Sequence, residues 1–461
     1  MIEISRSNLA NTLGIAYNCV PHFTSPEFVG GSAKIHCYSK DQGNSSLQMV
    51  LKYVVQNLIS TVVPELTMSP DERTDFINAV RQLNQGTRPN RFDLFTKWHL
   101  DATEYAHITP QFFPWHRAFL REYEKALQSI NPNVVLPYWN WSEDAENPLG
   151  SPVFSDSWFG GRGSSCVTSG PIANWQVYYP DGSPRCLRRD LTLNKEQVAS
   201  TAVIQNITRG TESYDEFEKL IEIVPHGNIH VGIGGDMVTM ASPNDPIFYL
   251  HHAYIDKIWA DWQKKGELFV WRYGGTNRED GSRALISDFM KPFNVQVASV
   301  MPTTSDSMCY IYSDFPESAP PPPNGTPTTA TLAAPSPTAT VATLSSVPDS
   351  WIRMQGGDIN MARQVEARLN SIVDGINRDV RQRQGGNGNG NGNGNGNGNG
   401  NGNGNGNGNG NGNGNGNGNG NGNAGGNGRG NAGGNGRGNA GGNGIGNAGG
   451  NVTGNAEGDT N

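Results

Sequence analysis

Apolar residues recur at helical spacing in several separate stretches of the first 265 residues. The clearest example is the stretch 69–85, which begins with a serine cap and a first-turn proline and carries its apolar side chains at Phe76, Ile77, Val80 and Leu83. We also predict helices over residues 93–106, 115–130, 214–223 and 246–264. Asp245 and Pro246 suit the start of the last one. Residues 142–200 are rich in Gly, Ser, Pro and Asn and predict long loops. The pattern therefore predicts a mainly α fold, a helical bundle decorated with loops.

The pattern changes after residue 315. Residues 316–350 form a Pro/Thr/Ser-rich linker, and residues 351–384 hold one short amphipathic segment. Its helix, predicted over 358–383, has a stripe of Val365, Leu369, Ile372, Ile376 and Val380, which we expect to dock on the core or on another chain. Residues 385–461 are a Gly/Asn-rich low-complexity tail with almost no apolar surface, so we expect it to be disordered. Residues 1–315 are then the one globular domain.

Composition narrows the function classes. The formal charge is −8 without a basic stripe, which argues against nucleic-acid binding, and no apolar run reaches the roughly 20 residues that span a bilayer. The five cysteines show no CxxC spacing, which argues against a zinc ribbon. Cys166 could pair with Cys186, and Cys19 with Cys37, leaving one over. Disulfides and Asn-X-Ser/Thr sequons favour a secreted or cell-wall protein, although the first residues do not resemble a signal peptide.

Histidine is the residue type that points to chemistry. Most of the nine histidines fall in three groups, which are His99, His107 and His116, then His226 and His230, then His251 and His252. Imidazole suits Zn, Cu, Fe and Ni. A zinc protease would carry Glu directly after the first histidine of "PHGNIH", but Gly227 stands there, and a non-haem iron triad would replace one histidine by a carboxylate. Two facing sites of three histidines each instead suit copper working with dioxygen.

The residues between these histidines resemble a known family. The stretches "HITPQFFPWHRAFLREYE" and "DPIFYLHHAYID" are similar to the two copper motifs of the tyrosinase, catechol oxidase and haemocyanin family, and "CYIY" at 309–312 resembles the tyrosine motif that closes its catalytic domain. The resemblance covers roughly residues 60–315 and implies a helical bundle holding two copper ions, with phenols and O2 as substrates. It assigns copper A to His99, His107 and His116, and copper B to His226, His230 and His252. His251 is then no ligand, because neighbouring residues on a helix point about 100° apart.

The resemblance also implies roles around the metals. Glu222 matches the acid that holds a water near copper B, with a solvated helix-end acid as the alternative. Gly227 stands where strong monophenol hydroxylases keep Asn, and Met240 matches a residue overlooking copper A, where it gates the substrate or belongs to the core. Asp256 lies one turn beyond His252 and orients the ligand surroundings, forms an ion pair with Arg117 or caps a helix.

Two departures from the family pattern affect these expectations. The cysteine that many relatives cross-link to the second copper A histidine is absent before His107, where Tyr105 and Ala106 stand. We see no sequence for a folded C-terminal lid, so we expect an open site.

The expected function is oxidation of o-diphenols or o-aminophenols to o-quinones. The alternatives are a tyrosinase with monophenol hydroxylation, a coat or wall structural protein that retains a copper site, and an oxygen carrier.

Overall fold

The computed structural model describes residues 2–5, 32–35, 60–62, 67–161, 164–305, 307–312 and 339–385, and six short strands between 396 and 432. The chain divides into two units, one made of Met1–Ser336 with Val341–Asp374 and the other of Pro337–Thr340 with Gly375–Asn461. Predictions for Cys19, Cys37, residues 316–338 of the linker and most of the Gly/Asn tail fall outside the described residues. Of the described helices, none is long and apolar enough to cross a membrane.

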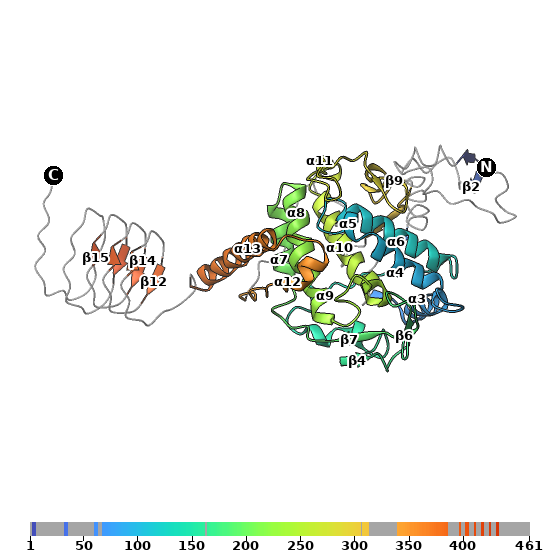
Figure 1. The fold of residues 1–461 in the computed structure, drawn as a ribbon. Coiled ribbons are helices and arrows are strands. Elements are labelled where there is room, and N and C mark those ends of the chain that lie inside the picture. The colour runs from blue at the N-terminus through green and yellow to red at the C-terminus, as the bar shows by residue number, and fades with distance from the viewer. Residues whose placement is uncertain are drawn as a thin grey trace, which may run out of the picture. The chain divides into compact units, whose positions relative to one another are not determined.

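Helices dominate the first unit, as the apolar pattern predicts (Figure 1). The longer ones are α3 Pro70–Leu83, α4 Arg91–Asp101, α6 Phe112–Gln128, α7 Thr201–Gly210, α8 Tyr214–Ile221 and α10 Ile247–Gln263. The shorter ones are α5 Thr103–Ala106, α9 Gly227–Ile233, α11 Glu267–Val270 and α12 Asp349–Met354. One π-helical turn, η5 Glu222–His226, joins α8 to α9. A single 3-10 turn, η6 Ser242–Asn244, precedes α10.

Two helix starts show why these residues fold locally as they do. The side chain of Ser69 accepts the backbone N–H of Glu72, and the side chain of Glu72 in turn accepts the N–H of Ser69, so two donors at the start of α3 are satisfied reciprocally. At the start of α10, the carboxylate of Asp245 accepts the N–H of Ile247 at 3.0 Å. The helix nevertheless begins one residue later than predicted, because Pro246 and not Asp245 occupies the N-cap position. The Asp245 carboxylate also pairs with the buried Arg189 at 2.6 Å.

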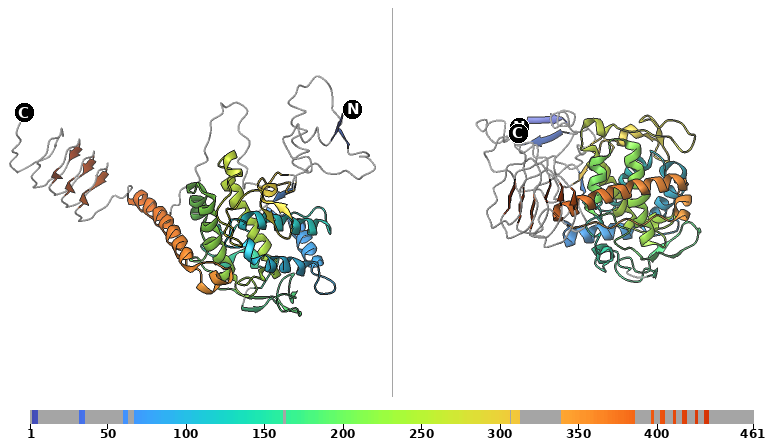
Figure 2. Two further views of the ribbon diagram at one scale, coloured as in Figure 1. Left: turned by 45° about the horizontal axis from the view of Figure 1, so that its top comes forward. Right: turned by 90° about the vertical axis from the view of Figure 1, so that its left-hand side faces the viewer.

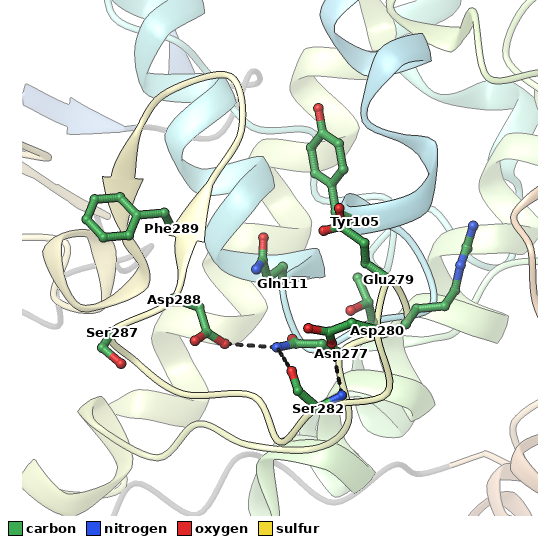
Figure 3. Close-up of a pocket in the computed structure, with 11 residues that line it drawn as sticks. Tyr105, Gln111, Asn277, Glu279, Asp280, Ser282, Ser287, Asp288 and Phe289 are labelled. Atoms are coloured by element: carbon green, nitrogen blue, oxygen red, sulfur yellow. Dashed lines mark hydrogen bonds between the residues drawn. The ribbon is translucent and has the colours of Figure 1, made fainter.

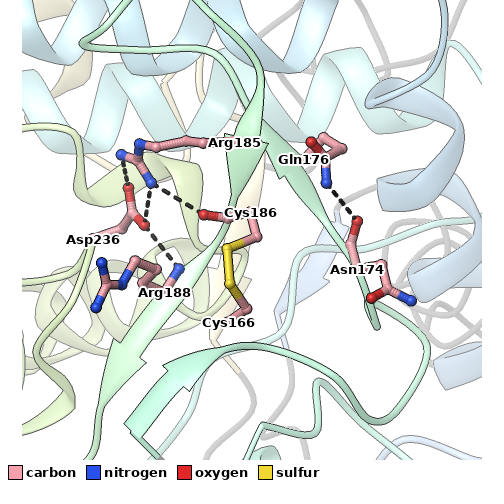
Figure 4. Close-up of a disulfide and its surroundings, with 7 residues drawn as sticks. All are labelled: Cys166, Asn174, Gln176, Arg185, Cys186, Arg188 and Asp236. Atoms are coloured by element: carbon pink, nitrogen blue, oxygen red, sulfur yellow. Dashed lines mark hydrogen bonds and ion pairs between the residues drawn. A yellow bond between two sulfur atoms is a disulfide. The ribbon is translucent and has the colours of Figure 1, made fainter.

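The predicted loop region 142–200 contains short turns and paired strands. Antiparallel pairs join β4 Ser164–Cys166 to β7 Arg188–Asp190 and β5 Gln176–Val177 to β6 Arg185–Cys186. The disulfide Cys166–Cys186 links them, as predicted (Figure 4). The two expected pairs would leave Cys309 as the free cysteine. Cys309 is instead disulfide-bonded.

The remaining elements are short. They include 3-10 turns η3 Pro148–Gly150, η4 Pro152–Phe154 and η7 Val297–Val300, and the pair β8 Phe289–Met290 with β9 Val295–Gln296. Strand β10 Tyr310–Tyr312 lies parallel to β3 Ser60–Val62, and β1 Ile2–Ser5 pairs with β2 Ser32–Ile35. In the second unit, β11 Gly396–Asn397, β13 Gly410–Asn411 and β15 Ala424–Gly425 form one parallel sheet, and β12 Gly402–Gly404, β14 Gly416–Gly418 and β16 Gly430–Ala432 form another.

The centre of the first unit is the pair α6 and α10, which lie side by side in the two views of Figure 2 and carry most of the residues of the two copper motifs. Their aromatic side chains interlock: Phe113 stacks on Trp259 at 5.3 Å between ring centroids. Deeper along the pair, the buried Arg117 of α6 donates to Asp256 of α10 at 2.6 Å. Asp256 also accepts from the hydroxyls of Tyr310 and Tyr312, which ties the "CYIY" stretch to the core. Among the three roles considered for Asp256, the ion pair with Arg117 is therefore the one observed.

The amphipathic segment forms α13 Ile359–Gly385, close to its predicted bounds. Leu369, Ile376 and Val380 of the predicted stripe are buried, whereas Val365 and Ile372 are only half-buried, and Val373 belongs to the buried face in place of Ile372. Arg368 pairs with Glu216 of α8 at 3.0 Å. The helix thus begins on the core of its own chain.

Candidate metal centre

Two groups of buried histidines lie in the middle of the helical unit. His99, His107 and His116 form one group, and His226, His230, His251 and His252 form the other, with the ligand atoms in each group within 4.8 Å of one another. The rings of His116 and His252 stack at 4.4 Å between centroids, so the two groups adjoin. The histidines that the sequence places in three separate stretches therefore converge. We call the first group cluster A and the second cluster B.

Backbone carbonyls hold most of these rings by their Nδ1 atoms. His99 pairs with Met240 at 2.8 Å, His116 with Phe112 at 2.8 Å, His226 with Glu222 at 2.8 Å, and His230 with Met237 at 2.7 Å. Because a carbonyl only accepts, each of these rings carries its proton on Nδ1 and turns the lone pair of Nε2 inward. The Nε2 atoms of His99, His116 and His226 are buried without a hydrogen-bond partner among the described residues. Such nitrogens fit a metal ion.

His251 and His252 differ in this respect. The indole Nε1 of Trp141 donates to Nδ1 of His251 at 3.1 Å. Since an indole N–H only donates, the neutral His251 ring must keep its proton on Nε2, which removes that atom as a ligand. Nε2 of His252 instead lies 3.2 Å from Nε2 of His230, close to the spacing of two nitrogens that each bind one ion at about 2 Å. This geometry supports His252 as the third nitrogen of cluster B.

Burial keeps both clusters uncharged. Desolvation lowers the pKa of His99 to about 3 and that of His230 to about 4, with smaller opposing contributions from their backbone partners. It also lowers the pKa values of the other histidines well below the usual range. Neutral imidazole is the form that binds metals, and an all-imidazole ligand set suits copper.

One short loop supplies ring anchors to both clusters. Met237 accepts from His230 and Met240 accepts from His99. The loop is fixed by Asp236, whose carboxylate binds the guanidinium of Arg185 at 2.6 Å and the backbone N–H of Arg188 at 2.9 Å (Figure 4). Its register therefore sets the orientation of one ring in each cluster. Met240 was predicted as a substrate gate through its side chain. What the structure adds is a role for its carbonyl oxygen.

Glu222 lies at the junction of the two clusters. Its backbone carbonyl accepts from His226, and its carboxylate accepts the backbone N–H of Ile108 at 2.7 Å. Burial raises the pKa of Glu222 to about 7, against the lowering effect of its hydrogen bonds. The alternative of a solvated helix-end acid is wrong, because the side chain is buried. The carboxylate binds the segment that carries His107.

Gly227 faces a residue from beyond the linker. A Cβ at this position would lie 2.9 Å from atoms Cη2 and Cζ3 of Trp351 in α12. The Trp351 ring also lies 5.9 Å from the ring of His226 and 6.3 Å from that of His230, and only 3% of the residue is exposed. The expectation of an open site is therefore wrong for this face of cluster B. The buried indole of Trp351 covers this face.

Sequence reasoning missed three residues that shape the centre. Trp141 fixes the tautomer of His251, Trp351 covers Gly227, and Arg278 donates to the backbone carbonyl of His107 at 3.0 Å. None belongs to a copper motif, and each acts through a contact across a large separation in sequence. Only Trp351 carried a signal, as a lone tryptophan that follows the linker directly.

Known proteins resemble this chain over the same region. Residues 89–265 match the family model described as the common central domain of tyrosinase. A tyrosinase of Streptomyces glaucescens is 36% identical over 262 residues, which cover 50% of this chain and 91% of the relative. A tyrosinase-like protein of Diaporthe leptostromiformis is 30% identical over 298 residues, covering 53% of this chain and 75% of the relative. The solved structure of a polyphenol oxidase mutant from Thermothelomyces thermophila aligns with a TM-score of 0.49 at 25% identity, covering 58% of this chain and 93% of that one.

Proposed function

The chain belongs to the tyrosinase family of copper oxidoreductases, and from this premise we propose that it uses O2 to oxidise o-diphenols or o-aminophenols to o-quinones. Members of the family bind two copper ions, and the two histidine clusters suit that pair. We assign one ion to His99, His107 and His116 and the other to His226, His230 and His252. When bound, copper supplies the electron transfer between the phenol and dioxygen.

The protein's own residues orient and shield this centre. Carbonyl anchors on Nδ1 preset the ligand tautomers, so binding of the metal requires little rearrangement of these rings. The surrounding aromatic residues exclude water, as Phe112 does with its ring 4.9 Å from those of both His116 and His226. His251 lines the centre without binding metal, because its Nε2 carries a proton.

The preference for diphenols rests on one observation, the contact of Trp351 with Gly227. Hydroxylation of a monophenol requires a positioned base that removes the phenolic proton. In strong monophenol hydroxylases of this family, Asn in the place of Gly227 helps an acid like Glu222 to hold a water for this task. Here the Trp351 ring leaves no room for such a side chain, and the Glu222 carboxylate already accepts the N–H of Ile108, so Glu222 would have to hold that water without the amide.

Oxygen uptake with matched substrates tests the proposal. The copper-loaded protein should consume O2 with catechol at once, and with tyramine only slowly and after a lag. Dopamine, which carries the side chain of tyramine on a catechol ring, controls for recognition of the amine. Fast, lag-free uptake with tyramine would refute the diphenol preference, and uptake with none of the three would refute oxidase activity for this chain.

The variant Glu222→Gln separates the two roles of Glu222. Its amide oxygen can still accept from Ile108, so catechol oxidation should persist within a few-fold. If Glu222 serves as the base, the residual tyramine activity should be lost. Equal loss with both substrates would instead assign Glu222 to the construction of the site alone.

A further inference from the structure

His107 is held differently from the other members of cluster A. His99 and His116 stand on α4 and α6, and a backbone carbonyl holds each ring by its Nδ1. His107 stands just after the four-residue helix α5, in extended backbone. Its Nδ1 is buried and has no hydrogen-bond partner in the described part of the chain. This side chain lies on no long helix, and no backbone carbonyl holds its ring. The position of the His107 side chain therefore depends on how its own backbone is held.

The peptide unit between His107 and Ile108 is gripped at both ends. Its carbonyl oxygen, on His107, accepts from Nη1 of Arg278 at 3.0 Å. Its N–H, on Ile108, donates to the Glu222 carboxylate at 2.7 Å. Ile108 has a φ of 50°, a left-handed conformation that a β-branched residue rarely adopts unless its surroundings impose it. The hydrogen bonds to the side chains of Arg278 and Glu222 hold the peptide in this conformation.

Packing does little for this loop on the side where Arg278 lies. A polar cavity of about 310 Å³ is lined there by Tyr105 and Thr109, on either side of His107, and by Arg278 itself. Figure 3 shows that its other walls are mostly polar side chains, such as Asn277 and Asp288. Because the loop has few van der Waals contacts on the side of the cavity, the hydrogen bond from Arg278 fixes its position there.

We propose that Arg278 is a positioning residue for the copper ligand His107, through the His107–Ile108 peptide that it clamps together with Glu222. The same Nη1 atom also donates to the backbone carbonyl of Gln355, just after α12. Arg278 therefore joins the cluster A loop to the segment that covers cluster B. The inference rests on the ligand assignment of His107 proposed above.

Copper release from the fully loaded protein tests this role. In Arg278→Ala, one of the two ions should pass to a chelator about 10–100-fold faster than in the wild type, and the other at the wild-type rate, because loss of a group that orients a ligand typically weakens metal binding by that factor. Arg278→Lys, which keeps one charged donor, should fall in between.

Arg272→Ala is the matched control. Arg272 belongs to the same loop region, is similarly half-buried, and donates to the carbonyl of Glu212 at 2.5 Å, but it touches no histidine loop. This variant should release both ions as the wild type does. The copper-free forms of both alanine variants should melt at similar temperatures, which separates positioning from general stability.

Three outcomes would overturn the proposal: wild-type release of both ions from Arg278→Ala, equal acceleration of both ions, or the same acceleration in Arg272→Ala. His107→Ala identifies the affected ion, since it should lack the ion that Arg278→Ala releases quickly. Failure of the wild-type protein to hold two ions would count against the ligand assignment instead, so the two failures are distinguishable.

Discussion

Clusters A and B present the same kind of nitrogen ligands, but one ligand of cluster A stands on a different kind of backbone. In cluster B, His230 and His252 stand within helices, and His226 closes a π-helical turn that runs into α9. In cluster A, His107 stands in extended backbone before a residue of positive φ. The covering differs too, because Trp351 lies against cluster B.

The difference shows two physical routes to a fixed ligand. A helix sets the position of a ring through the regular backbone, so the surroundings need only choose the tautomer. A ligand in a loop requires that individual hydrogen bonds hold the peptide itself, and here Arg278 and Glu222 do so. Many relatives bind the equivalent histidine by a cross-linked cysteine, which this chain lacks.

The largest expected effect comes from a neighbouring pair in cluster B. His252→Ala should lose one of the two copper ions and the oxidase activity, because His252 offers Nε2 beside that of His230. His251→Ala, the matched control, should keep both ions, and should lose about 1–3 kcal/mol of stability because the indole N–H of Trp141 is left unpaired. Copper content by atomic absorption and thermal unfolding measure both. Loss of copper only in His251→Ala would reverse the assignment.

The next effect concerns the bridge between the helices that carry His116 and His252. Asp256→Ala leaves the buried guanidinium of Arg117 without its charged partner, which should cost about 3–5 kcal/mol of unfolding free energy. Asp261→Ala, which removes a partner of Lys257 near the surface of α10, should cost about 1 kcal/mol or less. Denaturant unfolding of the copper-free proteins measures both. Equal costs would mean that the carbonyls of Val300 and Met301, to which Arg117 already donates, suffice to hold its charge.

A smaller effect should follow from uncovering cluster B. Trp351→Ala removes the indole beside His226 and His230, so catechols with bulky ring substituents should gain about tenfold in kcat/KM relative to catechol, the scale on which pocket size discriminates. Trp271→Ala alters a tryptophan that is 47% exposed on the surface and should leave this ratio unchanged. An unchanged ratio in Trp351→Ala would show that the phenol approaches from another side.

Much of this molecule follows from its sequence, for reasons that the comparison makes clear. The helices and the convergence of the histidines depend on local periodicity and on motif spacing, which a sequence displays directly. The choice of His252 over His251 agrees with the geometry because neighbours on a helix point in different directions. The break at Ala102 between α4 and α5, which divides the predicted helix 93–106, follows no such signal.

Contacts between distant segments could not be predicted. Arg278 meets His107 across 171 positions, and no periodicity encodes that bond. The amphipathic pattern of residues 358–383 indicated a docking helix but not the core surface it meets, and the packing of Trp351 on Gly227 depended on that surface.

The smallest effect is expected from Gly227→Ala, and it tests directly whether Trp351 covers cluster B. The sign of its effect on the free energy of unfolding should depend on whether Trp351 is present. Gly227 has helical angles, φ −60° and ψ −39°, so alanine fits its backbone and favours a helix by up to about 1 kcal/mol. In the wild-type background the new methyl group would meet the Trp351 ring, and the overpacking should destabilise the protein by about 1–3 kcal/mol. In the Trp351→Ala background the same substitution should be neutral or stabilising. A double-mutant cycle on the copper-free protein, followed by thermal unfolding, measures this coupling. If Gly227→Ala has the same effect in both backgrounds, the indole does not rest on this glycine in solution, and the cover over cluster B would have to come from other residues.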